Sequence, residues 1–229
     1  MSDLSVRRVD FGYFVRPAEE TGIGSSRVEP CLGYLVHHAD DLVLVDTGMG
    51  SNPDVDARYR PCRHPLPEAL AAAGVSLTEV TLVVNCHLHF DHCGGNPLLA
   101  GCPIVAQRAE LELARGADYT LQELVDAPGL HYLEIEGEAE ILPGVIVVPT
   151  PGHTSGHQSL VVRIADGTVV VAGQSHDTAS AYGADVLAWE ASREHHEADL
   201  PLTPAWIDRL QQFDPRRVVF AHDHATWEP

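Results

Sequence analysis

Four residues with metal-binding side chains fall within one stretch of six, His87-Leu88-His89-Phe90-Asp91-His92. The stretch directly follows an apolar segment that is predicted to be a buried strand. If the extended backbone continued past that strand, His87, His89 and Asp91 would project the same way, and a turn would bring His92 around. Imidazole nitrogen and carboxylate oxygen suit zinc or a similar divalent ion, and a site without thiolate and with an open position is of the catalytic type. The stretch therefore predicts a catalytic metal site rather than a solvated histidine loop.

Two later histidines follow predicted strands in the same manner. His153 lies in the segment Thr150-Pro151-Gly152-His153-Thr154, where the Pro-Gly pair forces a turn that can aim a side chain inward. His222 comes directly after the apolar residues 218–221. Either histidine alone would more often be structural, but beside the first stretch both become candidate ligands.

Short strands and helices alternate along the chain and would hold these residues in loops. The predicted strands are 9–15, 32–36, 42–45, 80–86, 103–106, 131–135, 145–148, 158–164, 168–172 and 217–221. The predicted helices are 67–73, 107–115 and 204–213, and the proline-containing segment 51–65 is expected to be irregular. Since neither a fixed-period repeat nor a long linker interrupts this pattern, we expect one α/β domain over residues 1–229, with a two-layered sheet core flanked by helices.

The charge balance excludes several classes of partner. The 229 residues include 33 acidic and 14 basic ones, which gives a net charge of −19, and every basic side chain other than histidine is arginine. Binding to nucleic acid and to anionic membranes is therefore disfavoured. The longest apolar runs have the length of strands, far short of the roughly 20 residues that a membrane helix needs.

The cysteines and the first residues bear on the cellular compartment. The five cysteines contain no Cys-x-x-Cys pair, which argues against a disulfide framework and a thiolate zinc site. The first eight residues have no apolar stretch after their charges, so we expect no secretory signal and a cytoplasmic location.

These motifs resemble those of the metallo-β-lactamase superfamily. The resemblance rests on His87-x-His89-x-Asp91-His92, Pro151-Gly152-His153-Thr154 and Ala221-His222-Asp223, with Asp46-Thr47-Gly48 similar to an early turn of the family, and it covers nearly the whole chain. Segments 142–145, 149–153 and 156–160 look most like the N-acyl homoserine lactonase group. The resemblance implies a four-layer αβ/βα sandwich with a dinuclear metal site between the loop ends of its two sheets.

The resemblance also implies how the ligands are divided. One metal would be held by His87, His89 and His153, and the other by Asp91, His92 and His222. Asp46 and Asp223 are expected to orient ligand histidines by hydrogen bonding, and His157 to orient the His153 turn. The site with three neutral imidazoles is expected to bind its metal more tightly than the other site.

The chain departs from the family at the position of the aspartate that usually bridges both metals, where it has Gln174. A neutral amide in place of a carboxylate predicts asymmetric binding with a weaker second ion. Asp177 stands where the lactonase group has a tyrosine near the substrate, and it could supply the missing carboxylate only if the loop is re-routed. Tyr182 could replace that tyrosine, and His176 is a further candidate for substrate contact.

The implied activity is hydrolysis of a lactone or related ester by a metal-bound hydroxide, with an N-acyl homoserine lactone as the specific substrate. Asp91 would pass a proton to the leaving alkoxide. Zn²⁺ is the expected cofactor, with manganese and iron as alternatives. The sequence alone leaves the acyl-chain preference and the oligomeric state open.

Three other functions stay open at this point. A thioesterase resembling glyoxalase II, or a tailoring hydrolase of a biosynthetic pathway, would use the same scaffold. A metal-poor binding or regulatory protein could have kept the fold after losing the bridging carboxylate. An iron-dependent oxygenase acting on a persulfide ranks below the hydrolases.

Overall fold

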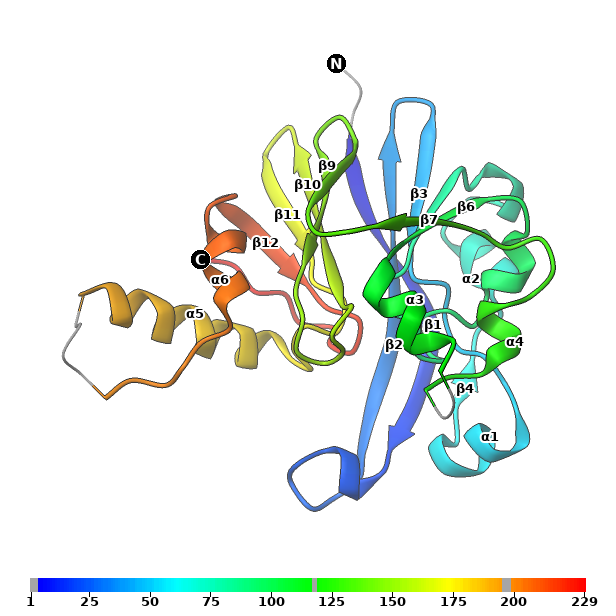
Figure 1. Ribbon diagram of the computed structural model, residues 1–229, viewed down its shortest axis with the longest axis horizontal. Coiled ribbons are helices and arrows are strands. Elements are labelled where there is room, and N and C mark those ends of the chain that lie inside the picture. The colour runs from blue at the N-terminus through cyan, green and yellow to red at the C-terminus, as the bar shows by residue number, and fades with distance from the viewer. Residues whose placement is uncertain (1–3, 117–118, 195–198) are drawn as a thin grey trace.

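The computed structural model describes residues 4–116, 119–194 and 199–229, and it contains two β-sheets that face each other (Figure 1). The first sheet has the strand order β4-β1-β2-β3-β5-β6-β7 and the second β12-β11-β10-β9-β8. The strands of the first sheet are β1 (Ser5–Arg16), β2 (Arg27–His38), β3 (Asp41–Val45), β4 (Cys62–Arg63), β5 (Leu82–Val84), β6 (Pro103–Gln107) and β7 (His131–Ile135). Those of the second sheet are β8 (Ala139–Leu142), β9 (Val145–Pro149), β10 (Gln158–Ile164), β11 (Gly167–Val171) and β12 (Pro215–Val219).

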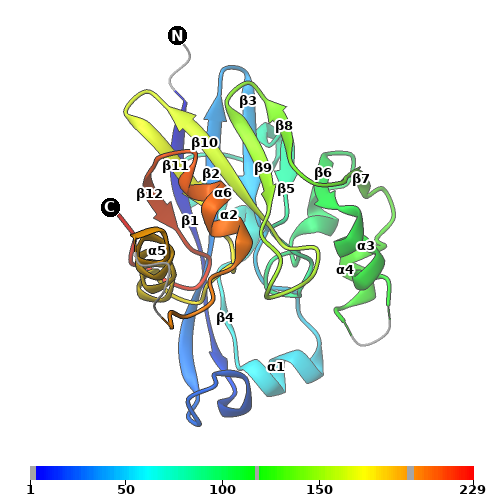
Figure 2. The same ribbon diagram turned by 60° about the vertical axis from the view of Figure 1, so that its left-hand side comes forward.

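Helices cover the outer faces of both sheets (Figures 1 and 2). The α-helices are α1 (Pro53–Tyr59), α2 (Leu66–Ala72), α3 (Arg108–Ala114), α4 (Gln122–Val125), α5 (Ala179–Glu194) and α6 (Ala205–Gln211). The short 3-10 helices are η1 (Ala18–Glu20), η2 (Leu77–Glu79) and η3 (Asn96–Leu99). Each predicted strand and helix overlaps an observed element, and the four-layer αβ/βα sandwich is confirmed.

The expectation that 51–65 is irregular was wrong, because α1 and β4 lie within it. Asn52 caps α1 by accepting a hydrogen bond from the Val55 amide at 2.8 Å, and Pro53 occupies the first helical turn, where its missing N–H costs nothing. The segment therefore carries a helix start signal that its proline content conceals.

The core between the sheets follows from the alternation of side chains along each strand. In β2, Tyr34 and Val36 face the second sheet, whereas Leu35 faces α2. The inward-facing residues of β9, β10 and β11 are mostly valine and leucine, which pack well on a pleated surface. The outer face of the second sheet is covered by α5 and α6 through Tyr182, Val186 and Ile207.

The carboxyl ends of several strands meet at one edge of the sandwich. β3, β5 and β6 are parallel, and β9, β11 and β12 point the same way in the second sheet because β10 is antiparallel to both β9 and β11. Backbone hydrogen bonds join the two sheets at this edge, with Gln158 N donating to Cys86 O at 2.8 Å and Leu32 N to Ala221 O at 2.9 Å. The predicted histidine and aspartate ligands follow β5, β9 or β12, and Gln174 at the predicted bridging position follows β11, so all of them reach the same edge.

Within the described ranges, none of the helices has the length and apolar character needed to traverse a bilayer. The opening residues 1–3, and with them part of the segment used to predict the location, fall outside those ranges.

Candidate metal centre

The structure brings His87, His89 and His153 together, and we call them the triple-histidine cluster. His87 Nε2 lies 2.9 Å from His89 Nδ1, which lies 3.1 Å from His153 Nε2. Four nitrogens placed about 2.0–2.1 Å from a tetrahedral zinc would be roughly 3.3 Å apart, so this spacing is close to that of a ligand set. His87 is buried, His89 is half-buried and His153 is exposed.

The second group, which we call the aspartate cluster, consists of Asp91, His92 and His222. His92 Nε2 lies 3.2 Å from His222 Nε2, and Asp91 Oδ2 lies 3.7 Å from the first nitrogen and 3.5 Å from the second. The point equidistant from these three atoms is about 2.0 Å from each, which is the length of a zinc bond to nitrogen or oxygen. All three side chains are buried.

Each cluster takes residues from both sheets. His87, His89, Asp91 and His92 follow β5 of the first sheet, whereas His153 and His222 follow β9 and β12 of the second. Neither cluster could therefore form on one sheet alone.

The loops that carry the clusters pack too closely for side chains at two glycines. A Cβ on Gly94 would lie 2.0 Å from the Gly50 nitrogen, and one on Gly173 would lie 2.5 Å from the Cys86 Cβ. Gly173 also has a φ of +58°, which L-residues rarely adopt. It therefore allows the chain to turn at the end of β11 and to bring Gln174 towards the ligands.

Asp46 orients one ligand, as the sequence predicts. Its Oδ2 accepts a hydrogen bond from His92 Nδ1 at 2.9 Å, and its Oδ1 accepts from the Cys86 amide at 2.9 Å. Asp46 has a φ of +60°, a left-handed conformation that costs a non-glycine residue free energy and that aims this carboxylate. With Nδ1 donating, His92 directs Nε2 to the aspartate cluster.

The expectation for Asp223 was wrong. Its carboxylate accepts hydrogen bonds from the amides of Ala179, at 2.9 Å, and Ala225, also at 2.9 Å, and so caps the start of α5. The partner of His222 is the backbone carbonyl of Pro30, which accepts from His222 Nδ1 at 2.8 Å. Sequence reasoning favours a neighbouring carboxylate and gives no signal for a carbonyl that lies 192 residues away.

His157 holds the loop after β9, in agreement with its expected place. His157 Nδ1 donates to the Thr150 carbonyl at 3.1 Å, and its Nε2 accepts from the Gln174 amide at 3.1 Å. This buried ring therefore joins the His153 turn to the turn that carries Gln174.

Glu110 supports the site in a way that the sequence did not predict. Its buried carboxylate accepts hydrogen bonds from the Leu88 amide at 2.7 Å, the Thr154 hydroxyl at 2.7 Å and the Tyr119 hydroxyl. It thus ties the loop after β5 to the loop after β9. An acidic residue in a helix ordinarily faces solvent, so its position in α3 gave no sign of this role.

Gln174 lines the cavity beside the clusters, together with His89, Asp91 and His153. Its side-chain amide nitrogen donates to Asp177 Oδ1 at 3.5 Å. Asp177 is in turn bound by Arg27, whose Nη2 lies 2.7 Å from Asp177 Oδ2. Asp177 is therefore beside Gln174 but outside both clusters.

The two other candidates for substrate contact are not at this cavity. Tyr182 is fully buried on the inward face of α5, where its hydroxyl accepts a hydrogen bond from Gln211 at 3.0 Å, so the expectation that it replaces the family's tyrosine was wrong. His176 Nε2 lies 3.1 Å from Asp185 Oδ2, and the His176 ring packs against Tyr182 and Trp206. Because helix α5 was not predicted, the inward direction of Tyr182 was missed.

The cavity beside the clusters has a volume of about 170 Å³ and combines aromatic with charged walls. Its lining residues are Phe14, Arg16, Glu20, Tyr59, His89, Phe90, Asp91, Tyr119, His153 and Gln174. Phe14, Tyr59 and Phe90 contact one another, with ring centroids 4.8 to 6.4 Å apart. One side of the cavity is therefore an aromatic wall, and the other carries the metal-binding groups.

The protonation states at the site suit metal binding. Burial lowers the pKa of His89 to about 4, and burial together with the neighbouring histidines lowers that of His153 to about 3. Burial alone would raise the pKa of Asp91, but His92 and His222 lower it to about 2. At neutral pH these two imidazoles are neutral and the carboxylate is ionised, which are the forms that bind metals.

The donor chemistry of the residues fits a cation. His92 Nδ1 and His222 Nδ1 each donate to an oxygen, so both Nε2 atoms face Asp91 Oδ2, at 3.7 Å and 3.5 Å, and lie 3.2 Å from each other. Burial lowers the pKa of His92, but the neighbouring Asp91 and Asp46 raise it above its usual value, so this buried group of atoms favours a positive charge among them. The aspartate cluster therefore has the character of a metal site.

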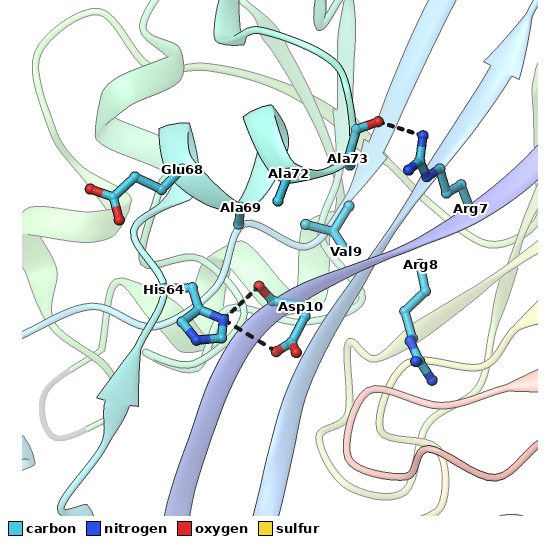
Figure 3. Close-up of a pocket in the computed structure, with 9 residues that line it drawn as sticks. All are labelled: Arg7, Arg8, Val9, Asp10, His64, Glu68, Ala69, Ala72 and Ala73. Carbon is cyan, nitrogen blue, oxygen red and sulfur yellow. Dashed lines mark hydrogen bonds and ion pairs between the residues drawn. The ribbon is translucent and has the colours of Figure 1, made fainter.

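A larger groove lies apart from this site, between β1 and α2 (Figure 3). It has a volume of about 440 Å³ and is lined by Arg7, Asp10 and His64 among others. Arg7 donates to the Ala73 carbonyl at 2.6 Å at the end of α2, and His64 faces Asp10. These contacts join a helix to its sheet and leave the metal-binding groups on another part of the fold.

The two sheets with their outer helices, and the ligand loops at one edge, define a known class of protein. The family model of the metallo-beta-lactamase superfamily matches residues 26–222, and the chain belongs to this superfamily. The resemblance inferred from the histidine motifs is thereby confirmed.

Within the superfamily the chain is similar to N-acyl homoserine lactonases. It is 36% identical to one from Bacillus sp over 147 residues, which are 58% of this chain and 58% of that protein. It is 28% identical over 166 residues to the N-acyl homoserine lactonase AttM of Rhizobium johnstonii, covering 62% of this chain and 63% of that one. The alignments therefore span about three fifths of the curated relatives' length.

The solved structures extend the likeness over nearly the whole fold. A variant of AiiA from B. thuringiensis, with N-decanoyl-L-homoserine bound at its active site, superposes with a TM-score of 0.76 at 25% identity and covers 98% of this chain and 95% of that one. The dizinc quorum-quenching lactonase AidC shares the fold with a TM-score of 0.67 at 15% identity, covering 97% of this chain and 88% of that one.

Proposed function

We propose that this chain is a metal-dependent hydrolase that opens lactones, with N-acyl homoserine lactones as its substrates, and that residues 1–229 act as one hydrolase domain. The observation that carries the proposal is the convergence of two three-residue donor clusters on one cavity. The lactonase relatives, and the N-decanoyl-L-homoserine bound at the active site of a neighbour of the same fold, support the substrate class.

Zn²⁺ is the proposed cofactor, held by the triple-histidine cluster and, more weakly, by the aspartate cluster. When bound, Zn²⁺ would lower the pKa of a coordinated water to about 7 and would polarise a carbonyl oxygen. The chain's own ring nitrogens supply neutral donors, and Asp91 supplies one negative charge. No serine or cysteine nucleophile is required by this chemistry.

Asp91 is the proposed proton carrier. Its Oδ2 faces His92 and His222, which leaves Oδ1 as the oxygen that takes a proton from the attacking water and passes it to the leaving alkoxide. Its low pKa keeps the carboxylate ionised at neutral pH, so that Oδ1 carries no proton before the reaction. The aromatic wall of Phe14, Tyr59 and Phe90 offers apolar surface to the substrate and excludes water from the carbonyl.

The test uses the proton that lactone opening releases. A pH-indicator assay with acyl homoserine lactones should show acidification that disappears when a chelator removes the metal and returns when Zn²⁺ is restored. Simple aliphatic lactones serve as the control for specificity. Cleavage of thioesters without opening of either lactone class would replace this proposal by the thioesterase.

Gln174 favours one alternative of a different kind, a metal-poor binding protein, because a neutral amide lines the cavity beside the clusters. Metal analysis of the purified chain separates the two, since the hydrolase requires at least one firmly bound ion. The cytoplasmic location and the absence of nucleic-acid and membrane partners stay predictions of the sequence.

A further inference from the structure

Four charged residues form a continuous chain of ion pairs next to the candidate metal centre. Arg16 Nη2 lies 2.7 Å from Glu29 Oε2, Arg27 Nη2 lies 2.5 Å from Glu29 Oε1, and the same Arg27 nitrogen lies 2.7 Å from Asp177 Oδ2. Glu29 is only 2% exposed, so solvent screens its two ion pairs weakly. The chain therefore connects β1 and β2 of the first sheet to the loop that follows β11.

The last member of this chain touches Gln174. Asp177 Oδ1 lies 3.5 Å from Gln174 Nε2. An ionised carboxylate only accepts hydrogen bonds, so the end of the amide that faces Asp177 must be the NH₂ group. The amide oxygen then points away from Asp177, and the Gln174 side chain lines the cavity together with His89, Asp91 and His153.

We infer that Asp177, held by Arg27, is a positioning residue that fixes the Gln174 side chain with its oxygen directed at the donor clusters. The ion pair with Arg27 also keeps the Asp177 carboxylate out of those clusters, so the neutral oxygen of Gln174 takes the place between them. The inference rests on the proposed function only in that both require a metal.

The arrangement sets which atom the centre offers to a second ion. With its oxygen inward, Gln174 is a neutral ligand or hydrogen-bond acceptor. With its NH₂ group inward it would present two donors to a cation, which is unfavourable. Groups that orient ligands in this way typically change metal affinity about 10- to 100-fold when they are removed.

The experiment measures Zn²⁺ binding by competition with a chromophoric chelator, and the absorption spectrum of the Co²⁺-loaded protein as a second readout. Asp177→Leu should bind the second ion at least about 10-fold more weakly and change the Co²⁺ spectrum. Asp177→Asn keeps an oxygen for Gln174 and should fall between this variant and the wild type.

Two controls isolate the route through Gln174. Glu138→Leu removes a carboxylate of similar exposure that lies 2.7 Å from Arg209 and belongs neither to the clusters nor to the chain from Arg16 to Asp177, and it should leave Zn²⁺ binding unchanged. In a Gln174→Leu background, Asp177→Leu should cause no additional loss, because contacting residues that act through one another are not additive.

Wild-type affinity in Asp177→Leu, or an equal loss in the Gln174→Leu background, would overturn the inference. A readout without metal keeps the two proposals apart: the side-chain NH₂ protons of Gln174 should exchange slowly in the wild type by NMR and rapidly in Asp177→Leu. Rapid exchange in both proteins contradicts the inference. Tight Zn²⁺ binding without lactone opening contradicts only the proposed function.

Discussion

The triple-histidine cluster and the aspartate cluster lie side by side but differ in charge and exposure. The first has three neutral imidazoles, and its His153 is exposed at the cavity. The second is buried, contains the ionised Asp91 and is supported by Asp46 and by the Pro30 carbonyl. The first cluster is therefore the one open to substrate, and the second is the one most firmly built into the protein.

Two properties of the clusters predict opposite orders of metal affinity. Three imidazoles and the neutral Gln174 favour a tighter first site, because a second ion meets uncompensated positive charge. The carboxylates of Asp91 and Asp46 favour the aspartate cluster. We expect the triple-histidine cluster to bind its ion more tightly, and the variants below test this order.

The largest effect is expected for His89→Ala. The variant removes one of three neutral donors, so it should lose most bound metal and all lactone hydrolysis, measured by metal analysis and the pH-indicator assay. His131→Ala, an exposed histidine on β7, is the matched control. Greater metal loss in His222→Ala than in His89→Ala would reverse the order, and full activity of His89→Ala would exclude the metal mechanism.

Gln174→Asp should raise the occupancy towards two ions per chain. The new carboxylate adds a negative charge between the clusters and so offsets the repulsion of the second ion. Gln174→Asn introduces a side chain of the same size as aspartate but without its charge, so it should not raise the metal occupancy. Two equally tight sites in the wild-type titration would show that the charge argument is wrong.

Asp46→Asn should weaken the aspartate cluster by about 10- to 100-fold in metal affinity, because His92 loses the anionic acceptor that orients its ring. Binding at the triple-histidine cluster should change much less. Chelator competition on the wild type and the variant separates the two sites. An equal loss at both clusters would mean that Asp46 stabilises the loops in general.

The smallest effect is expected for Asp223→Ala. This residue caps α5, so the free energy of unfolding in denaturant should fall by about 1 kcal/mol while metal affinity stays unchanged. A loss of metal binding would show that Asp223 orients His222 after all.

The sequence was sufficient for the residues whose position depends on local pattern. Strand ends, the alternation of His87 and His89, and the turn before His153 all follow from spacing within a few residues. The two sheets could be expected from the same strand pattern and from the family resemblance.

The residues that were missed depend on contacts between distant segments. Glu110, the Pro30 carbonyl and the chain from Arg16 to Asp177 act on residues from other strands, and no local pattern marks them. Helix α5 was missed because only Ala179, Tyr182 and Val186 are buried along its 16 residues, too few for a clear apolar stripe.

Because each cluster takes its donors from both sheets, the metal centre depends on the order of folding. His92 and His222 are 130 residues apart, so their side chains can meet only after the two sheets have docked. Ions would then be captured by an almost finished fold instead of nucleating it. Once captured, they act as cross-links between the halves of the sandwich and shift the balance towards the folded state by mass action, so the lifetime of the protein in a cell would depend on the metal supply.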